Sequence, residues 1–398
     1  MFAAAAIGVS HLVQSTRAGA LYGLSMIPIL LLACIAKYPS LLTGLLYPAA
    51  TGKTLLQSYR EQGWWALGAF LAVGIYAMWF VLAAIAITTA GLFQALLGWP
   101  ESTDLATAIV LAIALAVLLG GRYQGLEHVS KVLLGLLAIL LPIAAIMVLP
   151  QLDTSASAWV MPDLDLPTVA FIIALTGWMP IPIDASVTTS TWAASRNELT
   201  GTRTTAKDAT LDFNVGYGMA VLFALCFVVL GAGVLHASGT TPPNAAGPFA
   251  AMVIELFTSQ LGDWSFYLIG TVAFVTMFTT LLTVLDGQVR VVSYAIELLR
   301  PGKLDMQRIY TPGLFFYAIG GFIVVYFFMQ NFNTFINFAT SLGFLIAPIV
   351  VVLNHRALFG QAVAAGAQPS RTLYWWSLSG GAVLFGASGV YFFLLVVG

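Results

Sequence analysis

The chain has 398 residues, of which 60% are hydrophobic and only 8% are charged, and its mean hydropathy is +0.94. No soluble domain of this length has such a composition, so we predict an all-α polytopic membrane protein. The apolar runs are continuous, which excludes a membrane barrel of short alternating strands. A formal net charge of −1 indicates no particular partner, and we expect no nucleic acid to bind. Cys34 and Cys226 both lie in apolar runs, which favours buried thiols over a disulfide.

Hydropathy predicts about eleven membrane spans within a single transporter-like domain that covers the whole chain. The expected spans are about 2–22, 23–47, 64–92, 104–121, 131–150, 166–194, 212–236, 264–290, 311–329, 332–353 and 373–396. No basic residue precedes the first span, which argues against a cleaved signal peptide.

Spans one and six are both irregular. Span six contains Met179-Pro180-Ile181-Pro182 and then Asp184, and each proline removes a backbone donor and clashes with the preceding turn. Inside a membrane, broken backbone is tolerated only against protein or a water-filled cavity. Two irregular spans five segments apart predict two five-helix repeats of inverted topology, with a substrate site between them. We expect the repeats at about 1–150 and 166–353, followed by an extra helix at about 373–396.

The charged loops predict the orientation. With the N-terminus in the cytoplasm, the cytoplasmic loops contain most of the Lys and Arg residues: Lys53, Arg60, Arg122, Lys131, Arg196, Arg203, Lys207, Arg290, Arg300, Lys303, Arg308, Arg356 and Arg371. The opposite loops contain only acids: Glu101, Asp104, Asp153, Asp163, Asp165 and Asp263. This asymmetry follows the positive-inside rule and predicts a plasma (inner) membrane protein with its C-terminus outside.

Five ionisable residues fall inside the expected spans: His11, Arg17, Lys37, Asp184 and Asp286. A charge at the bilayer centre is costly, so each should face protein or water and find a partner. One interpretation is that the two acids and two bases form buried ion pairs that only fix the packing. The alternative is that Asp184 and Asp286 belong to a cation or proton pathway, with Arg17 as a tuning charge.

The remaining candidates are ambiguous on residue type alone. Lys37 lies nearer the cytoplasmic end of its span, so we expect it to extend its ammonium to the interface. His11 could be a simple hydrogen-bonded residue, although its place in the first broken span favours a proton relay or a ligand. Met179 could contact a soft metal, but a methionine in a span more often fills the core. No nucleophile triad or phosphate loop is present, so an enzyme is not expected, and no cofactor is implied.

Several segments, taken in order, resemble the NRAMP family of proton-coupled divalent metal transporters. They are Met179-Pro180, where the family has Met-Pro-His, and the stretches Arg17 to Gly23, Ala49 to Leu55, Gly125 to Leu137, Leu285 to Gln288 and Phe344 to Ile349. The resemblance implies a LeuT-like fold with broken helices one and six. It also implies that substrate passes between spans one, six, eight and ten.

The departures from that family fall on its metal-binding residues. Where the family has Asp-Pro-Gly-Asn, this chain has Gly8-Val9-Ser10-His11. The family's metal-binding methionine corresponds to Met179 and its backbone carbonyl ligand to Thr176, while its two histidines are replaced by Ile181 and Ser186. Asp184 is an additional acid. Asp286 stands where the family has a small residue, two positions before Gln288.

These observations predict a secondary active transporter that works by alternating access. The substrate pathway is expected at Ser10, His11, Thr176, Met179, Pro180, Asp184, Asp286 and Gln288. The resemblance implies a divalent metal cation, for which Met179 and the additional acid Asp184 are the candidate ligands in a site rebuilt around Asp184, Asp286 and His11. Proton coupling is a further hypothesis. One alternative is a LeuT-fold carrier of a small organic or zwitterionic solute, and another is a membrane sensor that does not transport.

Overall fold

The computed structural model describes residues 8–99, 102–121, 123–299, 306–364 and 367–397, and all regular structure in these ranges is helical. The α-helices are α2 (Thr16–Tyr22), α3 (Ile27–Thr51), α4 (Leu55–Gln62), α5 (Trp64–Leu97), α6 (Thr103–Leu119), α7 (Tyr123–Val148), α8 (Leu166–Gly177), α9 (Ala185–Thr200), α10 (Ala206–Leu230), α11 (Ala246–Leu261), α12 (Phe266–Leu299), α13 (Met306–Phe328), α14 (Phe332–Leu358) and α15 (Arg371–Val397). Short π-helical segments, η1 (Ser10–Ser15) and η4 (Gly231–His236), adjoin α2 and α10, and 3₁₀ turns occur at Leu149–Gln151, Ala156–Trp159 and Asp263–Ser265.

Eight helical segments are long and apolar enough to cross a membrane, and α6 and α8 are shorter apolar helices. The polytopic helical class is therefore confirmed, whereas the count of eleven spans stays a prediction. The first predicted span begins outside the described residues. Arg122, Arg300 and Lys303 of the basic loops also lie outside the described residues.

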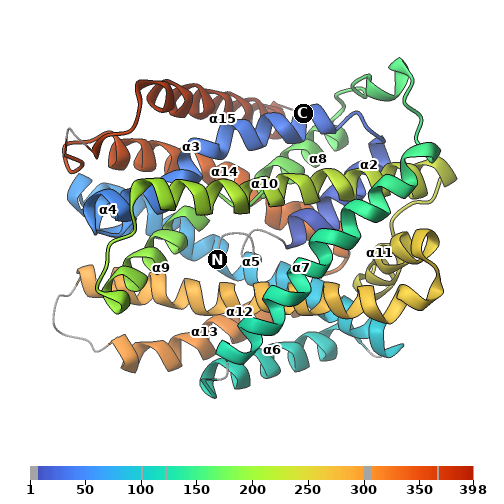
Figure 1. Ribbon diagram of the computed structural model, residues 1–398, viewed down its shortest axis with the longest axis horizontal. Coiled ribbons are helices and arrows are strands. Elements are labelled where there is room, and N and C mark those ends of the chain that lie inside the picture. The colour runs from blue at the N-terminus through green and yellow to red at the C-terminus, as the bar shows by residue number, and fades with distance from the viewer. Residues whose placement is uncertain (1–7, 100–101, 122, 300–305, 365–366, 398) are drawn as a thin grey trace.

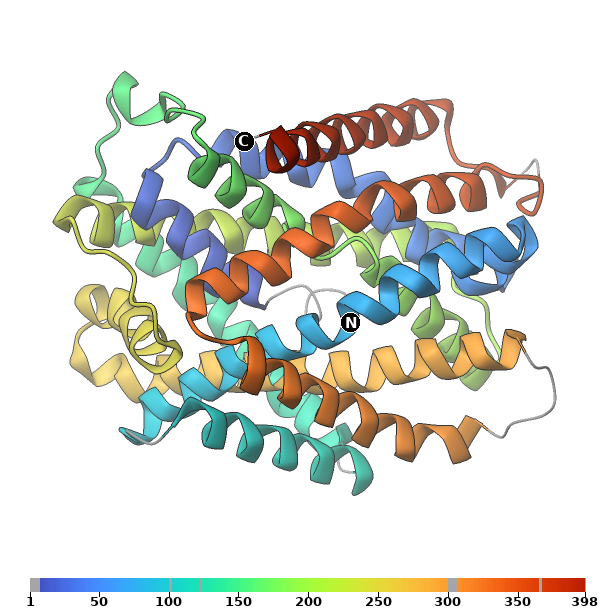
Figure 2. The same cartoon turned by 180° about the vertical axis from the view of Figure 1, so that it is seen from behind.

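The connections collect at the two ends of a helical bundle (Figures 1 and 2). The links from α3 to α4, from α9 to α10 and from α14 to α15 lie together at the left end of Figure 1, beside the end of α12 and the start of α13. We call this the basic end, because these links and the helix ends beside them contain Lys53, Arg203, Arg308, Arg356 and Arg371. The segments 149–165 and 237–245 lie at the opposite end.

Span six is broken, as its prolines predict. Asp165 is the N-cap of α8, and its carboxylate accepts a hydrogen bond from the Thr168 N–H at 2.9 Å. The Thr168 contacts lower the pKa of Asp165 below its usual value. The helix ends at Gly177, and α9 starts only at Ala185. Because Pro180 and Pro182 have no N–H to donate, the carbonyls at the end of α8 need other partners.

Close helix packing positions this break. α8 lies against α14 and α9 lies against α3. A Cβ atom on Gly177 would come within 2.0 Å of the Thr340 carbonyl oxygen on α14, so this crossing requires glycine. One apolar core cluster includes residues of α5, α11, α12 and α13, and a second includes residues of α3, α8 and α14. Residues of the break contribute to both clusters, with Trp178 in the first and Met179 in the second.

Candidate functional site

A central cavity of about 80 Å³ lies beside the break in span six. Its walls come from four parts of the chain: the first described residues, α5, the break with the start of α9, and α12. The lining residues are Gly8, Val9, Ser10, Val81, Ile85, Trp178, Ile181, Pro182, Asp184, Ala185, Thr188, Thr189, Trp192, Thr280, Thr283, Val284 and Gln288. The wall is thus mostly apolar and aromatic, with hydroxyl groups, one amide and one carboxylate.

Asp184 is the acid of this cavity. It precedes the first residue of α9, so its carboxylate lies at the positive end of that helix's dipole. Within the described part of the chain, the carboxylate forms no hydrogen bond or ion pair with another residue's side chain. Its electrostatic neighbour is Lys37. Asp184 also lines a second, smaller cavity together with Gln288.

Lys37 is fully buried. We expected its ammonium to extend to the membrane interface, and it does not. Its Nζ donates to the carbonyl oxygens of Thr176 at 2.5 Å and Gly177 at 2.7 Å. These are the carbonyls that the end of α8 leaves without backbone donors. The expectation of a snorkelling lysine is therefore wrong, because the broken helix supplies acceptors inside the bundle.

His11 and Ser10 connect η1 to neighbouring helices. The fully buried His11 ring has Nε2 at 2.9 Å from the Ala220 carbonyl oxygen, which only accepts, so Nε2 is the donor. Its Nδ1 lies 3.0 Å from the Ser10 hydroxyl, and that hydroxyl also lies 3.4 Å from the Pro180 carbonyl. Ser10 lines the central cavity, whereas His11 stands behind it.

The two residues predicted to hold a metal, Met179 and Asp184, line no common cavity among the described residues. Met179 is fully buried within the second core cluster and lines neither cavity to which Asp184 belongs. The Thr176 carbonyl, the expected backbone ligand, accepts from Lys37 instead. No group of three or more His, Cys, Asp or Glu side chains suited to a metal occurs in the ranges that the structure describes.

Asp286 lies apart from the central cavity. Arg290, one turn further along α12, donates through Nε to both carboxylate oxygens at 2.9 and 2.8 Å, and the Tyr310 hydroxyl donates to one of them at 2.5 Å. The structure thus does not bring Asp286 together with Asp184. The acid faces α13, whereas Gln288, two residues later, lines the cavity.

Arg17 is buried, and its guanidinium contacts two side-chain amides and an aromatic ring. Its Nη1 donates to Gln14 at 2.9 Å and to Asn337 at 2.7 Å, and its guanidinium lies 5.3 Å from the centre of the Phe171 ring. Among the described residues, neither Arg17 nor Lys37 forms an ion pair with Asp184 or Asp286. The interpretation of two buried ion pairs among these four residues is therefore incorrect.

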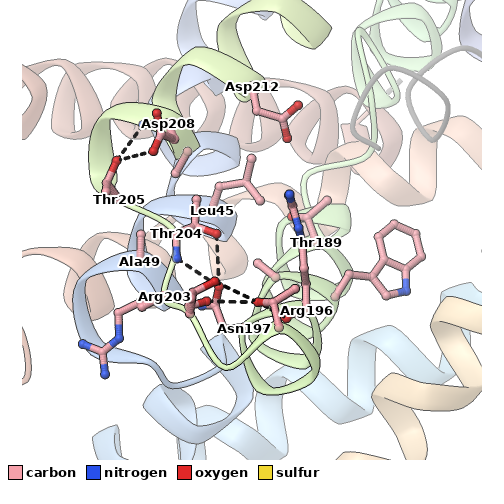
Figure 3. A pocket seen from close by; sticks show the side chains of 15 residues that line it. Leu45, Ala49, Thr189, Arg196, Asn197, Arg203, Thr204, Thr205, Asp208 and Asp212 are labelled. Atoms are coloured by element: carbon pink, nitrogen blue, oxygen red, sulfur yellow. Dashed lines mark hydrogen bonds between the residues drawn. The ribbon is translucent and has the colours of Figure 1, made fainter.

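A larger cavity of about 490 Å³, which we call the vestibule, opens at the basic end (Figure 3). It is lined by α3, α9, the link to α10 and the start of α10: Leu45, Ala49, Thr189, Trp192, Ala193, Arg196, Asn197, Thr200, Thr202, Arg203, Thr204, Thr205, Asp208, Ala209 and Asp212. Thr189 and Trp192 line both the vestibule and the central cavity. The vestibule was not among the predicted features, although the polar end of α9 is a sequence signal for it.

The link between α9 and α10 is ordered by its own side chains. Asn197 accepts from the backbone and hydroxyl of Thr204 at 3.1 Å each, and Thr205 caps α10 through the Asp208 N–H at 3.1 Å (Figure 3). The vestibule wall therefore has a defined shape up to its mouth.

Several solved structures share this architecture. MhsT, in complex with L-phenylalanine, superposes with a TM-score of 0.71 over 98% of this chain and 96% of its own, at 17% identity. A mutant of the Eremococcus coleocola manganese transporter gives 0.70 over 97% of this chain and 83% of its own, at 12% identity. The chain therefore has the LeuT fold of secondary transporters, as expected.

The family follows from the sequence comparisons. The model of the Nramp family (natural resistance-associated macrophage protein-like) matches residues 1–390, and this chain belongs to that family. An uncharacterized protein of Pasteurella multocida (strain Pm70) is 31% identical over 363 residues, which cover 89% of this chain and 82% of that relative.

Proposed function

We propose that this Nramp-family transporter moves a small organic solute with a protonated amino group, which binds beside Asp184. The observation that supports this proposal is a cavity whose one carboxylate bonds to no other side chain among the described residues. Hydroxyls and indole rings surround it. A carboxylate accepts from an ammonium through short, charge-assisted hydrogen bonds. Trp178 and Trp192 provide aromatic surface for the rest of such a solute, and ammonium groups also bind over indole faces.

The ligand set supports an organic solute over a metal ion. Divalent cations require several oxygen, nitrogen or sulfur ligands to replace their water, and Asp184 is the one acid that lines the cavity. A protonated Lys37 repels a dication near the end of α8, and in a poorly solvated interior this repulsion is weakly screened. A monovalent ammonium needs one carboxylate and a few hydroxyls, which the cavity contains.

The two cavities support an alternating-access route. The central cavity and the vestibule share Thr189 and Trp192, so a small movement of these side chains would join them. We infer that this conformation faces the basic end, and that the basic end is cytoplasmic according to the positive-inside rule. On this orientation the N-terminus is cytoplasmic, the C-terminus is outside and the protein lies in the plasma (inner) membrane.

A divalent metal cation is the second candidate substrate. Membership of the Nramp family and the structural likeness to a manganese transporter favour it. Its ligands here would be Asp184, Gln288 and the cavity hydroxyls, since Met179 lines neither cavity.

We further propose that transport is coupled to protons through His11. A charged ring would donate from Nδ1 to Ser10, and the Ser10 hydroxyl would then turn to the Pro180 carbonyl. This link joins a titratable group to the break in span six. In proteoliposomes, His11→Gln should retain solute binding and lose uptake driven by a pH gradient. Unchanged pH-driven uptake would exclude this role.

Thermal-shift screening and uptake with the purified protein test the substrate. Amino acids, polyamines, carboxylates, Mn²⁺, Mg²⁺ and Ca²⁺ would be compared on wild type, Asp184→Asn and the matched control Asp286→Asn. We expect an amine-bearing solute to stabilise wild type by about 2.7 kcal/mol at 100 times its Kd. This effect should disappear in Asp184→Asn and remain in Asp286→Asn. A shift produced by Mn²⁺ and not by organic solutes would instead support the metal candidate.

A further inference from the structure

Lys37 spans from the middle of α3 to the carboxyl end of α8. Its ammonium lies 2.5 Å from the Thr176 carbonyl oxygen and 2.7 Å from that of Gly177, and the side chain is 0% exposed. No carboxylate lies within ion-pair distance of it in the described ranges. The contacts that hold this buried cation are therefore backbone carbonyls.

Those carbonyls form a natural site for a cation. The last carbonyls of a helix have no partners within the helix and carry the negative end of its dipole. In transporters with discontinuous helices, such carbonyl ends coordinate the sodium ion or proton that is coupled to transport. Here Pro180 lacks the backbone N–H that would otherwise donate to the Thr176 carbonyl four residues earlier. An ammonium with three N–H donors matches the two oxygens and leaves one donor over.

We propose that Lys37 is a tethered cation that permanently occupies the ion site at the end of α8, so that no free sodium or metal ion binds at these carbonyls. Because the ammonium is covalently attached to the protein, it stays in place throughout the transport cycle and is not released with the substrate. The inference concerns the carbonyl site alone and does not depend on which solute binds beside Asp184.

Removing the tether should create a vacancy that a free cation can fill. Lys37→Ala deletes the ammonium and most of the side chain while leaving both carbonyls in place. We expect purified Lys37→Ala to have a lower Tm than wild type, and to regain Tm saturably with ethylammonium or sodium chloride. Choline chloride at equal ionic strength and neutral 1-propanol should not restore it. Wild type should show no saturable response to ethylammonium, sodium or Mn²⁺ at this site.

Lys53→Ala is the matched control, because Lys53 is half-exposed and pairs with Glu61 at 2.6 Å at the basic end. It should respond to ethylammonium no more than wild type does. An ethylammonium response of Lys37→Ala equal to that of Lys53→Ala would overturn the proposal. So would a saturable sodium or metal stabilisation of wild type that persists in Asp184→Asn, since that ion would then bind away from the solute site.

A second pair of variants keeps the test decisive if Lys37→Ala does not yield folded protein. Lys37→Arg retains a positive charge, whereas Lys37→Met retains a similar length without charge. We expect the arginine variant to keep a higher Tm than the methionine variant. An equal or higher Tm for Lys37→Met would show that the carbonyls need no cation, and the proposal would fail.

Discussion

Arg17 is a buried charge that has no counter-ion among the described residues. Its guanidinium donates to the side-chain oxygens of Gln14 and Asn337, and Gln14 donates in turn to Thr340 at 3.0 Å. The network joins the first broken span to α14. Because these groups are buried, each one left without a partner costs about 1–3 kcal/mol. The charge therefore contributes to stability through its hydrogen bonds to amides.

Arg17→Gln should lower the free energy of unfolding by about 1–3 kcal/mol, because a shorter neutral side chain leaves the Gln14 side-chain oxygen unpaired. The Asn337 oxygen would keep one donor, Nε2 of Gln14 at 3.2 Å. Thermal unfolding in detergent measures the change. Arg290→Gln is the control, since Arg290 is about half exposed in its pair with Asp286 and such pairs contribute about 0–1 kcal/mol. Equal losses in the two variants would contradict the assigned role.

At the scale of the helices, Asn354 joins four elements. It lies fully buried on α14, accepts from the Tyr59 hydroxyl of α4 at 2.5 Å, and donates to Ser40 of α3 and Ser186 of α9 at 2.9 Å each. Ser186 is the residue that the resemblance aligns with a histidine of the family, and here its hydroxyl accepts from Asn354. This position therefore serves helix packing here, near the point where α9 and α3 meet.

Asn354→Leu should destabilise the bundle by about 1–3 kcal/mol for each group that loses its partner, most of all the Tyr59 hydroxyl. Asn331→Ala provides the comparison, because it removes only the N-cap of α14 and should cost about 1 kcal/mol. Both are measured as thermal unfolding midpoints on the same preparation. A larger loss in Asn331→Ala would contradict the role of Asn354.

At the scale of the whole molecule, the proposed orientation predicts which side of the membrane each exposed segment faces. An impermeant thiol reagent added to intact cells should label Ser155→Cys, in the exposed link before α8, and leave Thr200→Cys unlabelled until the membrane is opened. Thr200 is exposed at the mouth of the vestibule, while the native Cys34 and Cys226 are buried and should label in neither case. The reverse pattern would invert the assigned orientation.

Much of the fold follows from local properties of the chain. Apolar runs predicted the helices, and Pro180 and Pro182 predicted the break between α8 and α9, because a missing backbone donor acts wherever it occurs. The order of short motifs predicted the family. The candidate site was predicted in part: Ser10, Asp184 and Gln288 do line one cavity.

The partners of the charged residues were decided only by tertiary structure. Lys37 contacts carbonyls 139 and 140 positions away, and Arg17 contacts an amide 320 positions away. Met179 and Asp184, five residues apart along the break, face different surroundings. The sequence by itself determined where the helices run and where one breaks, because hydropathy and proline chemistry are local. Only the packing of helices decided which side chains meet, because that depends on which faces of distant segments are pressed together.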